Sequence, residues 1–287
     1  MSHRPLESKS TVLEGSSVDP VNPPLRWVGG KRLIVPYLLE RAPSDLSKRV
    51  YHEPFVGAGS FFFALGPTRA RLSDANAHLI ACYRRVRDEP ESIARYLEQH
   101  RKLHSSAHYY RERETYNRSR PSAAQAARFI YLNQSCFNGV FRVNMEGKYN
   151  VPYGKKDSPN LPNASHLKRI STLLHSATLM VADYQKAIAH VRKGDFVYLD
   201  PPYPPLNGTA YFTHYTKERF GDDDQSRLAK AVRELDRRGA MIMMSNADLP
   251  GIRRLYRGFT IRELSVMRFV SCKKTKHAVG ELVVTNY

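Results

Sequence analysis

A short acidic segment near residue 200 has the residue types of a catalytic loop. Asp200-Pro201-Pro202-Tyr203 follows the apolar run 195–199, which predicts a buried strand. Asp200 should then project from the strand's carboxyl end, where open α/β sheets bind ligands. Each proline fixes φ and lacks an N–H, so the carbonyls of Asp200 and Pro201 can act as preorganised acceptors for a substrate's N–H groups. The alternative is a rigid turn with a helix-capping Asp200.

A glycine turn earlier in the chain predicts a ligand-binding loop between a strand and a helix. Phe55-Val56-Gly57-Ala58-Gly59 lies between a strand-forming run, 49–55, and an apolar run, 60–65, that predicts a buried helix. Residues without a Cβ let the backbone approach a ligand closely, although a tight turn without a ligand fits as well. Asp74 ends the next predicted strand, where a carboxylate accepts hydrogen bonds from ribose hydroxyls or caps the following helix.

Composition limits the class of protein. The 287 residues are 41% apolar, enough for a buried core, and 45 Lys and Arg against 27 Asp and Glu give a formal charge of +18. This charge favours a polyanionic partner. Three distant cysteines, at 82, 136 and 272, predict neither a disulfide framework nor a metal site, and no apolar run approaches the roughly 20 residues that span a bilayer. We therefore expect a cytoplasmic protein without a membrane partner or a required metal.

The elements that must position these residues follow a βα rhythm with one interruption. Strands are predicted at 69–73, 177–181, 196–199, 241–244, 259–264 and 281–286, and further helices at 76–88, 185–191 and 224–238. Between them, 91–133 is helical in pattern and rich in Arg, and 137–144 with 148–151 predicts a β-hairpin. This predicts an α/β domain, 23–76 and 164–287, split by a mostly helical insertion, 77–163. Residues 1–22 read as a disordered leader or a cloning remnant.

The order of the motifs resembles one family. Trp27-x-Gly29-Gly30-Lys31, read alone, would be a surface loop. Together with Glu53-Pro54-Phe55-x-Gly57-x-Gly59-Ser60, Asp74-x-Asn76 and the later Asp-Pro-Pro-Tyr it resembles the Dam family of DNA adenine-N6 methyltransferases. The resemblance covers 23–287 and includes three further segments: 205–215, Ser245-Asn246 and Glu281-Leu282-x-x-Thr285-Asn286-Tyr287. One departure is Lys276-His277, where an arginine is expected.

The resemblance implies a Rossmann-like sheet that binds S-adenosylmethionine and an inserted target-recognition domain. It implies that Trp27 contacts the cofactor, that Lys31 binds the methionine carboxylate and that Asp74 holds the ribose. It also implies that Asp183 and Tyr184 line the adenine pocket of the cofactor, although Tyr184 could equally be a core residue at a helix start. The implied cofactor set is completed by Phe55, Gly57, Gly59 and Asp200.

The implied reaction suits the acidic loop. An exocyclic adenine amine is a poor nucleophile, and acceptors on both N–H bonds, the Asp200 carboxylate and the Pro201 carbonyl, would make its nitrogen more reactive. In line with the sulfonium methyl, that nitrogen could attack directly, without a covalent enzyme intermediate. The target base must leave the duplex to reach such a loop, and Tyr203 would stack on it.

The resemblance places DNA recognition on the predicted hairpin. A two-stranded ribbon fits the major groove of double-stranded DNA, where Arg and Asn make bidentate contacts with bases. The alternative is a hairpin that only buries its aromatic residues. The best-known members of the family read GATC and others read different sites. The predicted DNA-binding residues are Arg118, Asn133, Asn138, Gly139, Arg142 and Asn144.

Other classes fit the sequence less well. RNA and protein amide methyltransferases have a loop similar to Asn-Pro-Pro-Tyr or Asn-Pro-Pro-Phe, and enzymes of the cytosine-N4 type have one similar to Ser-Pro-Pro-Tyr. The permuted adenine class places its Asp-Pro-Pro-Tyr before the glycine motif. A non-catalytic DNA-binding regulator with a vestigial cofactor pocket is the alternative from a different class. We expect a bacterial or phage-encoded monomer or weak dimer. The DNA methylation that it carries out would serve either gene regulation and repair or a restriction system.

Overall fold

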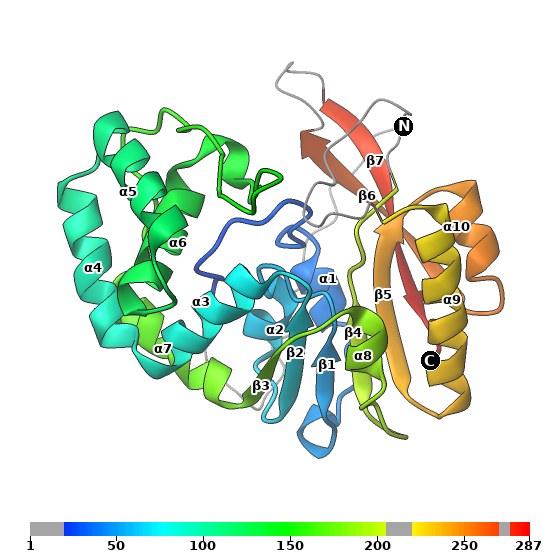
Figure 1. Cartoon of the computed structure of the whole chain (residues 1–287). Coiled ribbons are helices and arrows are strands. Elements are labelled where there is room, and N and C mark those ends of the chain that lie inside the picture. Colours follow the sequence, from blue (N-terminus) through cyan, green and yellow to red (C-terminus); the bar gives the residue numbers. More distant parts are fainter. Residues whose placement is uncertain (1–19, 205–219, 270–275) are drawn as a thin grey trace, which may run out of the picture.

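A seven-stranded mixed sheet forms the centre of the molecule, in the order β3-β2-β1-β4-β5-β7-β6 (Figure 1). The computed structural model describes residues 20–204, 220–269 and 276–287. The first five strands in this order are parallel, and β7 runs antiparallel to both β5 and β6. The strands are β1 Tyr51–Glu53, β2 Ala70–Asp74, β3 Ala177–Val181, β4 Phe196–Leu199, β5 Met241–Ala247, β6 Thr260–Phe269 and β7 Lys276–Thr285. The predicted α/β fold is confirmed.

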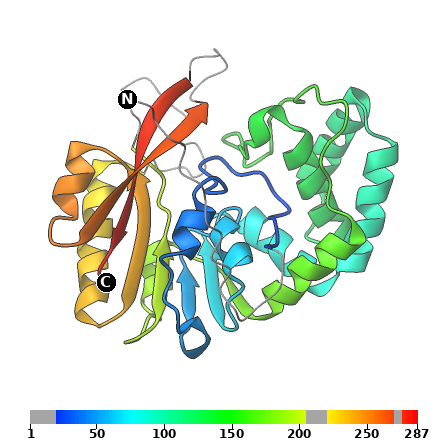
Figure 2. The ribbon, with the colours of Figure 1, turned by 180° about the vertical axis from the view of Figure 1, so that it is seen from behind.

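Two separate hydrophobic cores lie on the two faces of the sheet. Along β4, Phe196 and Tyr198 join one core and Val197 and Leu199 join the other, because successive side chains of a strand point to opposite faces. Figures 1 and 2 show helices on both sides of the strands. One face is covered by α1 Val35–Leu39 and α2 Ser60–Leu65, and the other by α8 Tyr184–Ile188, α9 Asp222–Arg237 and α10 Pro250–Leu255. No described helix has the length and apolar character that a membrane crossing requires.

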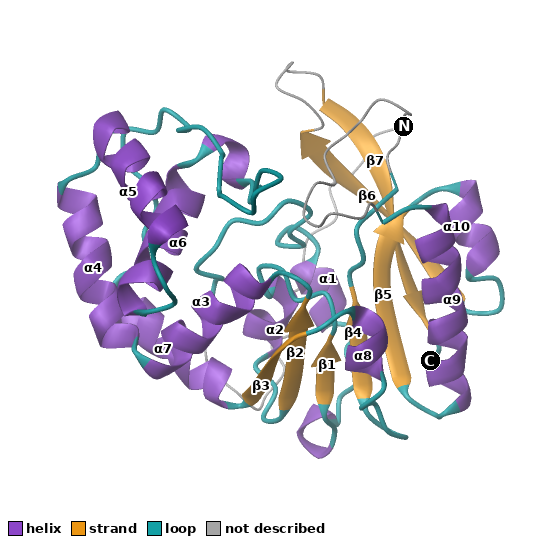
Figure 3. Cartoon of the chain, viewed as in Figure 1, coloured by secondary structure: helices purple, strands orange, loops and turns teal. Residues whose placement is uncertain are grey.

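Five helices gather beside the β3 edge of the sheet (Figure 3). They are α3 Ala77–Asp88, α4 Pro90–Lys102, α5 Ser106–Arg118, α6 Ala123–Ser135 and α7 Ala164–His175. Helix α6 contacts α3, α4 and α5, whereas α3 and α7 contact both β3 and the other helices. These two helices therefore connect the insertion to the sheet, and the domain boundaries at 77 and 163 stay a prediction.

The predicted β-hairpin is a loop with little strand structure, and this corrects the sequence reading. Phe137–Gly139 forms a 3-10 turn, and the only pairings of the loop are two isolated antiparallel bridges, Cys136 with Tyr153 and Val143 with Tyr149. Asn138 and Gly139 both have positive φ, which a strand cannot continue. The chain still folds back on itself, since the N–H of Asn144 donates to the carbonyl of Lys148 at 2.8 Å.

Part of the predicted leader, residues 20–22, contacts the rest of the described chain. Val21 is 5% exposed and belongs to the core on the α1 face. The carbonyl of Asn22 contacts His166 Nε2 at 2.9 Å. The fold therefore includes residues 20–22, whereas residues 1–19 and the motif at 205–215 lie outside the described residues.

Candidate active site

Three acidic side chains meet at one edge of the sheet. Glu53, Asp74 and Asp200 end or follow the parallel strands β1, β2 and β4, whose carboxyl ends share that edge. Burial raises the pKa of Glu53 well above its ordinary value, and the charges of Asp200 and Asp74 raise it further. This raised pKa favours the neutral, protonated form of Glu53 and leaves Asp200 and Asp74 as the acidic groups nearest to it.

Lys31 supplies the positive charge of this site. It is 5% exposed, and its Nζ lies 2.6 Å from Asp200 Oδ1 and donates to the Gly29 carbonyl at 2.7 Å. The same Nζ lies 4.4 Å from the centroid of the Tyr203 ring. One buried ammonium thus contacts both ends of the Asp-Pro-Pro-Tyr segment, which the motif spacing did not predict.

Tyr203 is held by a glutamate from the far end of the chain. Its hydroxyl donates to Glu281 Oε1 at 2.7 Å, and the same oxygen lies 3.8 Å from Lys31 Nζ. Glu281 is 1% exposed and reaches the loop because β7 inserts between β5 and β6. The sequence singled out the segment that begins at Glu281 but assigned this carboxylate no role.

Asp74 organises the glycine turn. Its Oδ2 accepts from the N–H of Gly57 at 3.1 Å and its Oδ1 from the N–H of Asn76 at 2.8 Å. Burial raises the pKa of Asp74. The cap of α3 is Asn76, whose side chain accepts from two backbone N–H groups of the first turn, so the alternative that Asp74 caps this helix is wrong. A carboxylate has about four acceptor positions, so Asp74 can accept further hydrogen bonds.

Trp27 lies against the glycine turn. Gly57 has φ of +46°, and a Cβ there would lie 2.9 Å from Trp27 Cδ1, too close for any real contact. The indole also stacks on Phe141, with ring centroids 6.1 Å apart and an interplanar angle of 15°. Trp27 therefore connects the predicted cofactor turn to the predicted DNA-binding loop.

Asp183 and Tyr184 have structural roles at the start of α8. Asp183 Oδ1 accepts from the N–H of Gln185 at 2.8 Å and caps the helix. Tyr184 is 5% exposed and stacks on Phe55, with centroids 5.3 Å apart. The alternative reading of Tyr184 as a core residue at a helix start matches this packing. Both residues follow β3, at the same edge as Asp74, so their contact with the cofactor adenine stays a prediction.

The predicted DNA-binding residues divide by exposure. Arg118, Asn138, Arg142 and Asn144 are exposed, whereas Asn133 and Gly139 are buried. Arg142 Nε donates to Asn150 Oδ1 at 2.8 Å across the loop, which holds the guanidinium.

Asn133 stabilises the fold by hydrogen bonds inside the protein. Its Oδ1 accepts from the N–H of Arg26 at 2.7 Å, and its Nδ2 donates to the carbonyls of Arg26 and Gly139. A Cβ on Gly139 would lie 2.7 Å from Arg26 Cβ. These contacts fix the segment that leads to Trp27, and they argue against direct DNA contact by Asn133 or Gly139.

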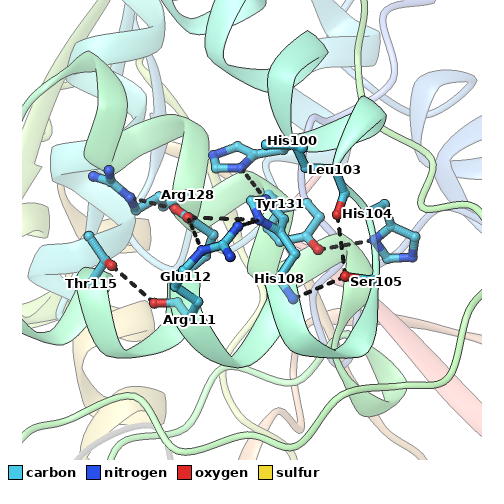
Figure 4. A network of polar contacts seen from close by, with 10 residues as sticks. All are labelled: His100, Leu103, His104, Ser105, His108, Arg111, Glu112, Thr115, Arg128 and Tyr131. Carbon is cyan, nitrogen blue, oxygen red and sulfur yellow. Dashed lines mark hydrogen bonds and ion pairs between the residues drawn. The ribbon is translucent and has the colours of Figure 1, made fainter.

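A buried histidine pair lies between α4 and α5 (Figure 4). Ligand atoms of His100, His108 and Glu112 lie within 4.8 Å of one another, the donor set of a metal site. However, Arg111 Nη2 lies 2.6 Å from His108 Nδ1, and Arg128 Nε lies 2.8 Å from Glu112 Oε2. Since an arginine only donates, His108 Nδ1 accepts, and its Nε2–H donates to His100 Nδ1 at 3.0 Å. The positive charges of Arg111 and Arg128 would repel a metal ion. The cluster therefore fits a hydrogen-bonded network around two neutral histidines instead.

Comparisons of the sequence with known proteins identify a family. A family model described as D12 class N6 adenine-specific DNA methyltransferase matches residues 27–270. The chain is 37% identical to the type II methyltransferase M.MjaIII of Methanocaldococcus jannaschii, over 93% of this chain and 99% of that protein. It is 36% identical to M1.LlaDCHI of Lactococcus lactis subsp. cremoris, over 93% and 96%. It is 32% identical to the DNA adenine methylase of Escherichia coli strain K12, over 90% and 93%.

Proposed function

Because the chain belongs to the D12 class of N6 adenine-specific DNA methyltransferases, we propose that it transfers a methyl group from S-adenosylmethionine to a flipped-out adenine at a specific site in duplex DNA. The observation that carries this proposal is the arrangement of Asp200. It follows the carboxyl end of β4, pairs with Lys31 at 2.6 Å, and precedes a tyrosine whose hydroxyl is fixed by Glu281.

The charges of the site fit S-adenosylmethionine. Its methionine part carries an ammonium and a carboxylate, which match Asp200 and Lys31 respectively, a pair of opposite charge. Asp74 would accept from the ribose hydroxyls, beside a glycine turn that lets the backbone approach closely. The cofactor, when bound, supplies an electrophilic methyl group. Trp27 would close the pocket from the side of the DNA-binding loop.

The loop residues would act on the target base. The Asp200 carboxylate and the Pro201 carbonyl accept from the two N–H bonds of the adenine amine, and this directs its lone pair to the methyl group. Tyr203 stacks on the base and replaces part of the stacking lost when the base leaves the duplex. Lys31 orients the Asp200 carboxylate through their ion pair.

Target recognition is proposed for the exposed part of the insertion. Asn138 and Arg142 lie on the loop that follows α6, and Arg118 ends α5. Arg142 has the donor geometry to read a guanine, and Arg118 the charge to contact a phosphate. The E. coli relative is named a DNA adenine methylase, and GATC is the first sequence to test.

The decisive experiment incubates the protein with labelled S-adenosylmethionine and mixed-sequence duplex DNA, and then maps the modified bases. Label on adenine N6 within one short sequence is the expected result. Label on cytosine, on RNA or on protein would contradict the proposal, and binding without transfer would favour a non-catalytic regulator.

A further inference from the structure

Two buried amides reach the catalytic loop from α9 and β5. Gln225 is 1% exposed and Asn246 is 0% exposed. Gln225 Nε2 donates to the Pro202 carbonyl at 3.0 Å, and Asn246 Nδ2 donates to Gln225 Oε1 at 3.1 Å. Burial of an amide costs free energy unless its hydrogen bonds are made. The two side chains therefore depend on each other and on the loop.

Backbone groups fix the direction of this chain of hydrogen bonds. Asn246 Oδ1 accepts from the N–H of Ala247 at 2.8 Å, so its Nδ2 is the group that faces Gln225. Gln225 must then turn Oε1 toward Asn246 and Nε2 toward the loop. A backbone N–H only donates and the Pro202 carbonyl only accepts, so each amide has a single satisfied orientation.

We propose that Gln225 and Asn246 are positioning residues for methyl transfer, which act by fixing the Pro202 carbonyl. This inference rests on the proposed function of the loop. Because the peptide group is planar, a fixed Pro202 carbonyl also fixes the direction in which the chain continues to Tyr203. The Pro202 carbonyl is occupied on the α9 side, which leaves the Asp200 carboxylate and the Pro201 carbonyl as the acceptors for the substrate amine.

The amide pair differs from the other contacts that hold the loop. Lys31 binds the Asp200 carboxylate and Glu281 binds the Tyr203 hydroxyl, both through side chains that the substrates are proposed to meet. Gln225 binds a backbone carbonyl of the loop, Asn246 supports Gln225, and neither side chain carries a charge. Their loss should therefore disturb the geometry of the reacting groups more than the binding of either substrate.

Isosteric substitutions test this distinction. Gln225→Glu and Asn246→Asp keep the shape of each side chain, and their ionised forms replace the donor group by an acceptor, which would repel the carbonyl oxygen it faces. We expect kcat to fall by about 10- to 100-fold, the cost of small misplacements of reacting groups. The KM for DNA and the Kd for S-adenosylmethionine should stay within about twofold of the wild-type values, because no binding group is removed.

Ser245→Ala is the matched control. Ser245 precedes Asn246 in β5 and is also 0% exposed, and its Oγ contacts the Tyr198 hydroxyl at 2.8 Å. The hydrogen bond that this substitution removes goes to a side chain of β4 and not to the Pro202 carbonyl, so kcat should remain near the wild-type value. A loss in this control as large as in Asn246→Asp would mean that the effect is structural, and it would overturn the proposal.

A double-substitution cycle gives a second test if a buried carboxylate prevents folding. Gln225→Met removes both hydrogen bonds without adding charge and should lower kcat as Gln225→Glu does. In the Gln225→Met background, the uncharged substitution Asn246→Leu should have no further effect on kcat, because the connection of residue 246 to the loop is already lost. Wild-type kcat in Gln225→Met or Asn246→Asp overturns the proposal. Failure of the wild-type protein to methylate adenine would instead contradict the proposed function.

Discussion

At the scale of single residues, the pairing of Lys31 with Asp200 defines the site. The buried ammonium of Lys31 orients the Asp200 carboxylate, and the same ammonium lies over the ring of Tyr203. The pair therefore couples the proposed acceptor of the adenine amine to the proposed stacking residue. Two side chains from opposite ends of the chain, Lys31 and Glu281, hold the loop that lies between them in sequence.

Asp200→Asn should abolish detectable methyl transfer. The amide keeps the size of the side chain but loses the charge that pairs with Lys31 and one of its two acceptor oxygens. We expect kcat to fall by at least about 10³-fold, since an acceptor aimed at the reacting group is lost together with its charge. Duplex DNA binding should change little, because phosphate contacts supply most of the affinity. Methylation assays with gel-shift titrations of the same variant check both expectations, and normal turnover would refute the catalytic assignment.

Arg142→Ala should change which sequences are methylated. A bidentate arginine–base pair contributes about 1–3 kcal/mol of discrimination at one base. Sequencing of methylated sites in a random library should show relaxed choice at one position of the target. Asn150→Ala, which removes the acceptor that holds Arg142 Nε, should relax the same position to a smaller extent. An unchanged profile of methylated sequences in both variants would show that Arg142 does not recognise a base.

At the scale of elements, the glycine turn between β1 and α2 depends on both conformation and contact. Gly57 and Gly258 both have positive φ, at +46° and +99°, but a Cβ at Gly57 would meet Trp27 whereas one at Gly258 would have nothing within 4 Å. The two positions thus separate backbone strain from steric contact.

Gly57→Ala should lower stability and weaken cofactor binding. We expect a loss of about 1–3 kcal/mol from the positive φ together with the contact on Trp27, and a smaller loss from φ alone in the control, Gly258→Ala. Urea unfolding gives the two losses, and calorimetric titration with S-adenosylmethionine gives the affinity. Equal losses in the two variants, with unchanged affinity in both, would contradict the role of Trp27 against this turn.

The packing of α4, α5 and α6 should depend on pH through the histidine pair. Burial lowers the pKa of His100 from 6.5 to about 4. The unfolded chain binds this proton below pH 6.5 and the folded chain does not, so stability falls as the pH drops from about 6.5 to about 4. The groups around His100 and its partner His108 include Glu112, Arg111 and Arg128.

His100→Gln tests this dependence. The substitution removes the titrating group, so the loss of unfolding free energy between pH 7 and pH 5 should shrink by about 1–2 kcal/mol relative to the wild-type protein. Urea unfolding at the two pH values measures the difference. An identical pH dependence in both proteins would show that another group titrates.

At the scale of the whole molecule, the net charge of +18 should dominate the electrostatic attraction of the protein to DNA. Each phosphate neutralised contributes about −0.9 to the slope of log K against log salt for duplex DNA. Arg118 ends α5 and is exposed, and we propose that it contacts a phosphate.

Arg118→Ala should reduce the magnitude of that salt slope by about 1 while it leaves the methylated sequence unchanged, the reverse of the expectation for Arg142→Ala. Fluorescence anisotropy titrations at several salt concentrations give the slope. A changed sequence preference in the Arg118→Ala protein would instead place this arginine at a base.

The sequence predicted most regular elements because local patterns encode them. The strands around Asp74 and Asp200 and the glycine turn before α2 were found from apolar runs and their bounding residues. The short helices α1 and α10 were missed because fewer than two turns carry little periodicity. Helix α7 was missed although Leu167, Ile170 and Leu174 have helical spacing.

By itself, then, the sequence determined the α/β class, the order of the motifs and the acidic loop with its proline-fixed carbonyls, since each depends on neighbouring residues. Only the tertiary structure decided which partners hold that loop. Glu281 and Gln225 meet it because β7 returns antiparallel between β5 and β6 and α9 covers β5. It also decided that Asn133 supports the Trp27 segment while Arg142 remains exposed. Contacts between distant segments follow from the strand order and from burial, and neither is encoded in a local pattern.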